Sequence, residues 1–457
     1  MFNRRDLLRS SLALTASPFI PMTSLAADTS GGYKALVCVF FKGGFDSHDM
    51  LIGTDQPSYN AWASARQSLI DNFADAGNAI ARDRTNLLNL VPDNAADFGS
   101  RQFGMPQEMI ALHDLFQQGK AAIVPNVGPL IEPATRQSID DGTVRIPSRL
   151  QSHNDQQSTW QSFSGEGSRV GWGGLMLDLM AQSSPFTAVS AGGEAVFLSG
   201  NDTRQTEISR SGNVATAWAT SERLDGSTER ALAVQEYYRV AGQGANNPMM
   251  RDIIDLQSRA VDNTNALSAA LDGQTLRDSV VVDGNSLSEA LGSIANMIAA
   301  RDTLGINRQV FYAQLGGFDT HNDHATRMPS LMTRLSEAIA SFTSTMESIG
   351  LGNQVTLFTA SDFGRTLTSN PSGTDHGWGG HQIVAGGAVR GRNILGGVPE
   401  FGLGHPLDFK RGSMIPEISV DQYGAELARW FGLNDSEADF IFPNRTNFDR
   451  NALQIFA

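Results

Sequence analysis

Five of the eight histidines in the sequence lie in or beside four short segments that also contain aspartate. Two of these segments are copies of one hexapeptide pattern, Gly43–His48 and Gly316–His321, with an Asp followed two residues later by a His. The other two segments are 359–366 and 375–381. Mixed Asp and His side chains are typical ligands of Zn²⁺ or Mn²⁺, whereas Asp alone favours Mg²⁺ or Ca²⁺. The pattern therefore predicts a divalent metal site.

All four segments supply candidate ligands. In extended backbone, residues i and i+2 point to the same side, so each hexapeptide can direct its Asp and its His at one spot. Three of the aspartates follow apolar, strand-like runs, and ligands gather at the carboxyl ends of strands in open α/β sheets. We predict a metal-ligand set of Asp46, His48, Asp319, His321, Asp362, His376 and His381, with His324 as an alternative to His321.

These residues can also be interpreted as having purely structural roles. The Asp after Gly-Gly-Phe can cap a helix, and Asp375–Gly377 can be a turn closed by a side-chain hydrogen bond. Arg365 can hold anionic oxygens, or it can pair with a buried Asp. The repetition of the hexapeptide, with His in both copies, favours the metal site.

A fifth segment, residues 148–157, offers a different set of groups. It contains the hydroxyl of Ser152, the imidazole of His153 and the guanidinium of Arg149 at a predicted helix start. Backbone N–H groups at a helix start favour an anion and help to activate a nucleophile.

The elements that must position these residues alternate between strand and helix. Apolar runs predict strands at 35–41, 121–127, 186–189, 309–315, 354–360 and 382–385. A 3.6-residue apolar period between 331 and 349 predicts a crossover helix, and 106–118 predicts another helix. The sequence thus favours an α/β fold, with a mostly parallel sheet sandwiched by helices.

We expect one domain over residues 27–457, with a polar, helix-prone insertion at about 201–308 that covers the sheet edge. Residues 1–26 have the features of an export signal, with the twin arginines Arg4 and Arg5, a moderately apolar stretch and a small-residue cleavage site at Ala26. We therefore expect a periplasmic or secreted protein that leaves by the twin-arginine route.

The composition narrows the range of partners. The formal net charge is −14, and because residues 1–26 carry three Arg and one Asp, the remainder stands at −16. Such an acidic surface repels nucleic acid and anionic lipid. No run of apolar residues is long enough for a membrane span. Cys38 is the single cysteine, so an internal disulfide is excluded and stability depends on the core.

Taken together, the leader, both hexapeptides, Ser152–Asp155, Ser361–Thr366 and Asp375–Gly379 resemble the secreted domain-of-unknown-function 1501 family over nearly the whole mature chain. That family in turn resembles the alkaline phosphatase and sulfatase superfamily, in which two divalent metals flank a Ser or Thr nucleophile. The resemblance implies a metal-bridging role for Asp46, first-metal ligands at Asp319, His321 or His324 and His376 or His381, and a second-metal ligand at Asp362. It also implies that Ser152 lies in the nucleophile region, with Ser148 as a rival.

The chain departs from the superfamily pattern at two points. Phe363 follows Asp362 where the superfamily has a His, so His48 or His153 must substitute for it. In the sulfatase-like peptide 145–149, Arg145 stands where a Cys or Ser is needed, so no formylglycine can form.

Two functions are therefore predicted. The first is an exported metal-dependent hydrolase of phosphate or sulfate esters, which acts on a small anionic ester or a polysaccharide, with Ser152, His153, Arg149 and Arg365 as catalytic residues. The second is a secreted binding or assembly protein, with an incomplete, non-catalytic site and a secreted protein partner.

Overall fold

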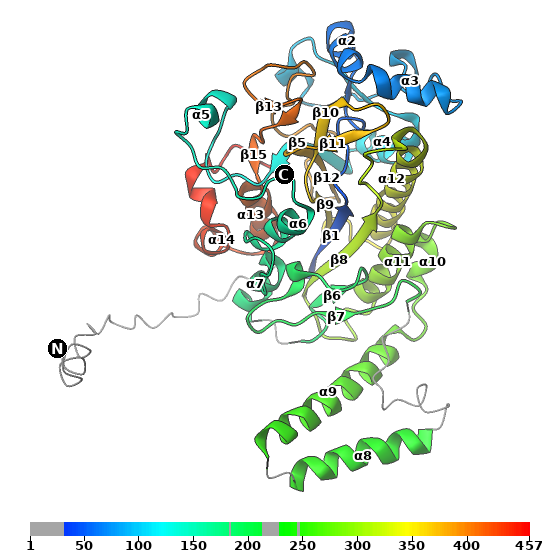
Figure 1. The fold of residues 1–457 in the computed structure, drawn as a ribbon. Coiled ribbons are helices and arrows are strands. Elements are labelled where there is room, and N and C mark those ends of the chain that lie inside the picture. The colour runs from blue at the N-terminus through cyan, green and yellow to red at the C-terminus, as the bar shows by residue number, and fades with distance from the viewer. Residues whose placement is uncertain (1–31, 182–183, 213–227, 245–246) are drawn as a thin grey trace, which may run out of the picture.

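A central eight-stranded sheet organises the computed structural model, which describes residues 32–181, 184–212, 228–244 and 247–457 (Figure 1). The export signal predicted at 1–26 lies outside these residues. In spatial order the strands are β15 (Ile418–Ser419), β5 (Ala121–Gly128), β12 (Gly380–Ala385), β9 (Val355–Ser361), β1 (Lys34–Lys42), β8 (Arg308–Gly316), β6 (Ala188–Ser190) and β7 (Thr206–Glu207).

The sheet is mostly parallel. β1 pairs in parallel with β8 and with β9, and β6 pairs in parallel with β8 and β7. Within the described sheet only β12 runs the other way, antiparallel to both β5 and β9. The mostly parallel α/β fold predicted from the sequence is confirmed.

Strand β1 shows why helices cover both faces. Its side chains alternate between the two sides of the sheet, as the strand period requires. Val37, Val39 and Phe41 join one buried apolar cluster. Leu36 and Phe40 join another on the opposite side.

The helices divide between these two faces (Figure 1). The first cluster includes side chains of α4 (Ile110–Gln117), α10 (Leu276–Val280), α11 (Ser286–Ala299) and α12 (His324–Ser348). The second includes side chains of α7 (Trp172–Leu179), α13 (Val420–Phe431) and α14 (Asp435–Ile441), and of Trp160 in α6 (His153–Ser162). Shorter helices are α2 (Gln56–Ala65), α3 (Gln67–Asp75) and α5 (Arg136–Asp140).

Three small sheets lie outside the central one. One is a ribbon of β10 (Arg365–Ser369) and β11 (Thr374–His376), which joins β9 to β12 along the chain. The second pairs β13 (Asp408–Lys410) with β14 (Ser413–Met414). The third has β4 (Phe103–Met105) between β2 (Ile52–Gly53) and β3 (Leu88–Asn89). The ribbon matters most for the site, because it carries Arg365 and His376.

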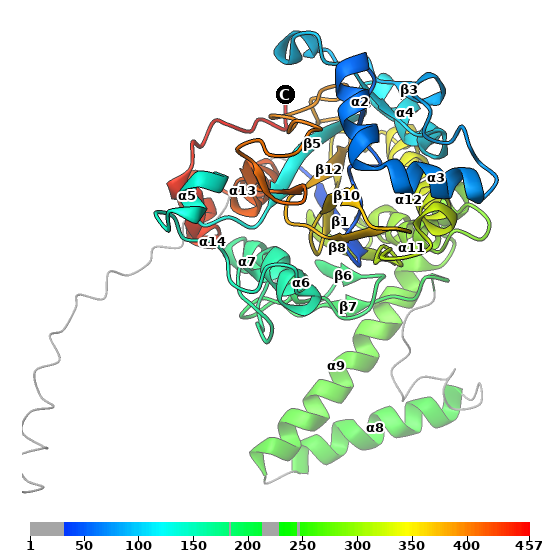
Figure 2. The same ribbon diagram turned by 45° about the horizontal axis from the view of Figure 1, so that its top comes forward.

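The segment 201–308 contains α8 (Thr228–Gly244), α9 (Pro248–Leu271), α10 and α11. Helix α11 packs on the body, against α10 and α12. Helices α8 and α9 instead form a hairpin that projects below β7, away from the body, in both ribbon views (Figures 1 and 2). The hairpin therefore does not cover the edge of the sheet, although the sequence had led us to expect this of the segment. None of the helices in the described part of the chain is both long and apolar enough to cross a bilayer.

Candidate metal centre

The two hexapeptides lie side by side at the carboxyl ends of β1 and β8. The last paired residues of these strands are Lys42 and Gly316, and the Phe318 N–H donates to the Lys42 carbonyl at 3.2 Å. Phe45 and Phe318 occupy matching positions in the two copies, and their ring centroids lie 5.2 Å apart. The repeat thus places two similar turns in direct contact, as the parallel pairing of the strands requires.

The approach of the two turns depends on glycine. Gly43 has φ +113°, a backbone conformation that L side chains rarely adopt. A Cβ at Gly43 would lie 2.4 Å from the backbone nitrogen of Asp319. The first hexapeptide can therefore support the second only while residue 43 has no side chain.

Imidazoles from three separate segments surround the carboxylate of Asp319. The distance from Asp319 Oδ1 is 3.2 Å to His321 Nε2 and 3.4 Å to His376 Nε2, and His153 Nε2 lies 3.6 Å from Oδ2. His321 Nε2 and His376 Nε2 are 2.9 Å apart. With metal–nitrogen bonds of about 2.0–2.1 Å, the ligand atoms of a tetrahedral ion lie about 3.3 Å from one another. The spacing of three of these side chains, His153, Asp319 and His376, fits a single ion, and His321 lies beside them.

The outer ring nitrogens of these histidines are also engaged. His153 Nδ1 donates to Asp362 Oδ2 at 2.5 Å, and His376 Nδ1 donates to the carbonyl of Gln151 at 2.8 Å. His321 Nδ1 lies 3.5 Å from Asp375 Oδ1. A carboxylate or carbonyl that accepts from Nδ1–H leaves the Nε2 lone pair free for an ion, which is the usual arrangement around metal-bound histidine.

The charges of the site also suit a cation. Burial acts to raise the pKa of Asp319, but the hydrogen bond and charge of Arg365 prevail and hold that pKa below its ordinary value. Burial lowers the pKa of His376, which keeps its imidazole neutral. The hydrogen bond to Asp362 raises the pKa of His153, so this residue must lose a proton when an ion binds. Three of the four, His153, Asp319 and His376, bring one ligand atom each within 4.8 Å of one another.

A family model described as "Protein of unknown function (DUF1501)" matches residues 33–438. The chain belongs to the DUF1501 family. No curated protein matches it.

Two solved structures resemble this DUF1501 protein weakly. The zinc complex of the C-terminal periplasmic domain of EcEptC from Escherichia coli shares 10% identity over 94% of each chain, with a TM-score of 0.32. The PsFucS1 sulfatase from Pseudoalteromonas sp. shares 9% identity over 93% of this chain and 74% of its own, with a TM-score of 0.33. Neither likeness is close enough to carry an argument about the site.

Asp46, predicted as a metal ligand, is engaged elsewhere in the DUF1501 protein. Its two carboxylate oxygens accept from the guanidinium of Arg66 at 2.7 and 2.8 Å, and both side chains are fully buried. The prediction assumed extended backbone, but the chain turns here, since the Asp49 N–H donates to the Asp46 carbonyl. His324, the alternative to His321, lies beside this pair, with its Nε2 3.4 Å from Asp49 and 3.7 Å from Asp46.

His48 and His381 also lie outside the group around Asp319. They are buried against each other, with ring centroids 5.4 Å apart, and burial lowers the pKa of His48 to about 3. His381 Nδ1 accepts from the Asn126 N–H at 3.0 Å, so the proton of the neutral ring sits on Nε2. Neither Nε2 has a hydrogen-bond partner among the described residues. A protonated Nε2 cannot coordinate an ion, which removes His381 from the ligand set.

Asp362 and Arg365 orient the metal group, because Asp362 binds His153 and Arg365 binds Asp319. Asp362 Oδ2 accepts from His153, from Gln157 at 3.1 Å and from the Gly43 N–H at 3.2 Å. Its Oδ1 is buried without a hydrogen-bond partner in the described chain, so it remains available as a further ligand atom. Arg365 is buried, and its Nη1 donates to Asp319 Oδ1 at 2.8 Å and to the Gly43 carbonyl at 3.2 Å. Arg365 thus positions Asp319, in line with the ion-pair alternative rather than with an anion clamp.

The predicted catalytic residues of the fifth segment lie at the start of α6. Ser152 is the residue before the helix, and its Oγ donates to Asp155 Oδ2 at 2.8 Å. The Arg149 side chain is 70% exposed and lies 3.4 Å from Asp155 Oδ1. His153 therefore joins the metal group, while Ser152 and Arg149 stand at its edge.

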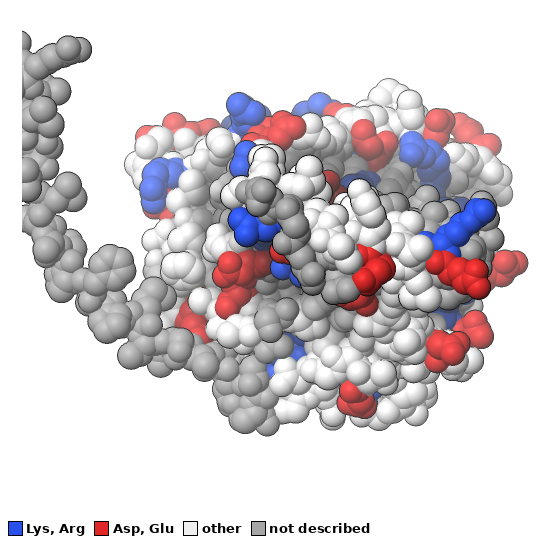
Figure 3. All heavy atoms as spheres, turned by 90° about the horizontal axis from the view of Figure 1, so that it is seen from below, with Lys and Arg blue, Asp and Glu red and all other residues white. Residues whose placement is uncertain are grey.

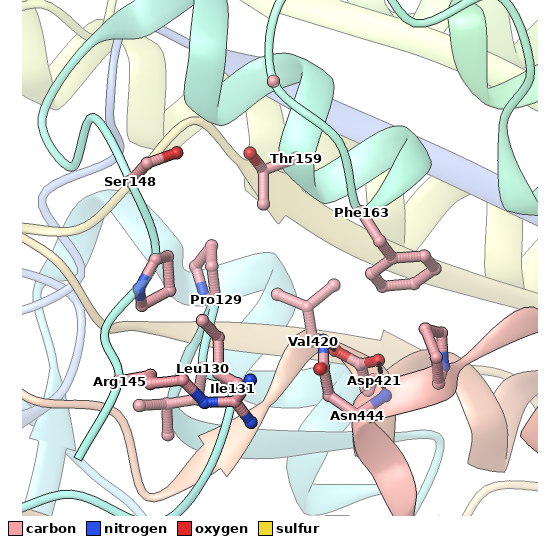
Figure 4. A pocket seen from close by; sticks show the side chains of 13 residues that line it. Pro129, Leu130, Ile131, Arg145, Ser148, Thr159, Phe163, Val420, Asp421 and Asn444 are labelled. Atoms are coloured by element: carbon pink, nitrogen blue, oxygen red, sulfur yellow. Dashed lines mark hydrogen bonds between the residues drawn. The ribbon is translucent and has the colours of Figure 1, made fainter.

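The rival nucleophile Ser148 lines a separate cavity of about 370 Å³ (Figure 4). The Arg145 guanidinium also lines this cavity and pairs with Glu132 at 3.3 Å. The other labelled side chains around the cavity are those of Pro129, Leu130, Ile131, Thr159, Phe163, Val420, Asp421 and Asn444.

Some residues of the site were not predicted. Asp375 and the Gln151 carbonyl orient two imidazoles, and Arg66 neutralises Asp46. Asp375 directly precedes a predicted ligand, which is a usable signal. A backbone carbonyl and an arginine 20 positions from its partner leave no such mark in a single sequence.

Proposed function

We propose that this protein is an exported metal-dependent hydrolase of phosphate or sulfate esters, built around one divalent ion. The observation that supports this most is the ring of three imidazoles around Asp319, with each outer nitrogen next to an oxygen. The ligands are Asp319, His153 and His376, with His321 beside them, a set that suits Zn²⁺ or Mn²⁺. The predicted leader at 1–26 supports export by the twin-arginine route to the periplasm or beyond.

The residues around the ion have separate tasks. A bound divalent ion lowers the pKa of a hydroxyl or water and neutralises charge on the transferring group. Asp362 and the Gln151 carbonyl fix the imidazole rings, and Arg365 fixes Asp319. The exposed guanidinium of Arg149 and the first N–H groups of α6 attract the anionic oxygens of the ester.

Ser152 is the candidate for the attacking hydroxyl. Asp155 accepts its hydrogen bond and fixes its rotamer, while Ser148, at the other end of the segment, lines the separate cavity. Ser148 and His153 are five positions apart in the chain, a span of at most about 18 Å. The cavity is therefore within reach of the organic part of an ester whose anionic group lies at the ion.

The test is metal content together with turnover. Purified protein loaded with Zn²⁺ or Mn²⁺ is expected to retain about one ion per chain by elemental analysis and to hydrolyse an aryl phosphate or an aryl sulfate. His376→Ala should lose both properties, whereas His113→Ala, in α4 and outside the metal group, should keep both. Retained metal and turnover in His376→Ala, or neither property in the wild type, would contradict the proposal.

One observation favours the second candidate, a secreted binding or assembly protein with an incomplete site. Asp46 matches the metal-bridging aspartate of the alkaline phosphatase and sulfatase superfamily. Here its carboxylate forms an ion pair with Arg66. In that case the ion only stabilises the fold. Stoichiometric metal, with no turnover of either ester class and a raised melting temperature on loading, would support this candidate over the hydrolase.

A further inference from the structure

The α8–α9 hairpin exposes an unusual amount of apolar surface. Seven of the fourteen exposed large apolar side chains of the described residues lie on these two helices. They are Leu232, Tyr237 and Val240 on α8 and Met249, Met250, Ile253 and Leu256 on α9. We call the 228–271 hairpin the arm and these seven side chains the arm patch. Patches of this kind mark interaction surfaces in soluble proteins.

The exposed positions are not the ones that hold the arm together. On α9, Ile254 and Val261 are about 5% and 4% exposed and form the buried side. Met249, Ile253 and Leu256 follow the i, i+4, i+7 spacing of a second stripe, which faces solvent. A two-helix hairpin with apolar stripes on two sides resembles half of a four-helix bundle, in which both stripes are buried.

The charge of the arm distinguishes between two possible partners, an anionic membrane and a second copy of this chain. Residues 228–271 carry four Arg and five acidic side chains, a net of −1, whereas the whole chain is at −14. The view from below, with the arm toward the viewer, shows basic and acidic side chains interspersed on this face (Figure 3). A helix that lies on an anionic membrane needs a polar face rich in Lys and Arg. The arm instead carries both basic and acidic side chains. Two copies of the arm can therefore pair with opposite charges in contact.

The dimensions are sufficient for such a pair. Helix α8 has 17 residues and α9 has 24, so at 1.5 Å per residue they are about 25 Å and about 36 Å long. A face two helices wide and one α8 long covers about 500 Å², so two copies would bury about 1,000 Å², the lower range of a specific interface. We propose that the arm is a self-association surface, through which two copies of this chain pair arm against arm in a four-helix bundle.

Sedimentation velocity over a concentration series of the full chain tests this pairing. The wild type is expected to move reversibly from the monomer mass to twice that mass. Tyr237→Glu combined with Ile253→Glu should raise the dissociation constant at least tenfold, and the fold is expected to be retained because Tyr237 is 68% and Ile253 48% exposed in the monomer. Phe440→Glu on α14 is the matched control, since Phe440 and Tyr237 are both 68% exposed, and it should leave pairing unchanged.

Cross-linking gives an independent readout. Cys38 is the single cysteine and is buried, so Met249→Cys introduces one reactive thiol on the arm. A short bismaleimide should join two copies of Met249→Cys through their thiols and leave the wild type unlinked. A wild type that stays monomeric at every concentration, a pair that survives both arm substitutions, or a monomer that sediments with anionic vesicles would overturn the proposal.

Discussion

Asp46 and Asp319 occupy the same position of a repeated hexapeptide but have opposite surroundings. Asp46 is fully buried against Arg66, whereas the side chain of Asp319 is 46% exposed and faces three imidazoles. The difference arises from partners elsewhere in the chain. The residue type alone therefore does not define its role.

Substitution should separate the two roles. Asp46→Asn leaves the Arg66 guanidinium buried without a counter-charge and should lower the free energy of unfolding by about 3–5 kcal/mol, with metal affinity retained. Asp319→Asn removes a central ligand and should abolish metal retention with little loss of stability in the metal-free protein. Urea unfolding and elemental analysis of both variants check this. Loss of metal in a folded Asp46→Asn variant would return Asp46 to the ligand set.

At this scale the sequence indicated which residues gather around Asp319. Asp319 and His321 point to one spot as expected, and Asp362 and His376 arrive beside them because they follow the next strand and its ribbon. Both hexapeptides turn at their Phe, and Asp46 and His48 diverge because a further turn, in which the Asp49 N–H donates to the Asp46 carbonyl, follows in the first copy. That turn depends on Arg66 and on packing against the second hexapeptide, which neither local pattern encodes.

At the scale of elements, the site depends on the contact between two strand ends. Gly43 and Gly316 stand at the same position of the two hexapeptides, yet a Cβ at Gly316 meets nothing within 4 Å. The first copy therefore acts as a support against which the ligand-bearing copy rests.

Alanine at these two glycines should give unequal results. Gly43→Ala forces a side chain into a positive φ and against the Asp319 backbone, so the free energy of unfolding should fall by about 2 kcal/mol or more and metal should bind more weakly. Gly316→Ala is the matched control and should change stability by less than about 0.5 kcal/mol. Chemical unfolding and metal titration measure both effects. Equal losses in the two variants would show that the close approach is unimportant.

The elements themselves were largely predictable. The apolar runs became β1, β5, β8, β9 and β12 with shifts of one or two residues at their ends, because buried parallel strands are continuous apolar segments. Helix α12 begins at His324, a full turn or more before the apolar stripe, and runs through Pro329. The direction in which α8 and α9 project could not be predicted, since no local signal fixes how a hairpin leaves the body.

At the scale of the whole molecule, one buried carboxyl opposes the usual trend of stability with pH. Burial raises the pKa of Asp421 from 3.8 to about 6, although the Asn444 N–H donates to it at 3.0 Å. As pH rises from about 4 to about 6, the unfolded chain loses this proton first. Folding then has to take up a proton or bury an ionised carboxylate, so this residue lowers stability across that window and its contribution stays unfavourable above it.

Asp421→Asn should remove this cost. The difference in free energy of unfolding between the variant and the wild type should grow by up to about 3 kcal/mol between pH 4 and pH 7, in favour of the variant. Comparison of the two proteins cancels the opposite slopes of carboxyls with lowered pKa, such as Asp435. Urea unfolding at both pH values measures the difference. A constant difference would mean that the start of α13 compensates the charge fully.

The place of the arm has a consequence for how the protein meets its target. In Figure 1 the β11 strand, with His376, lies over the upper half of the body, while α8 and α9 hang below β7. Two copies tethered by their arms would hold their metal centres at remote ends and face them outward. A target with repeated groups, such as the polysaccharide predicted from the sequence, would then meet two sites at once, and avidity would add to the affinity of either site.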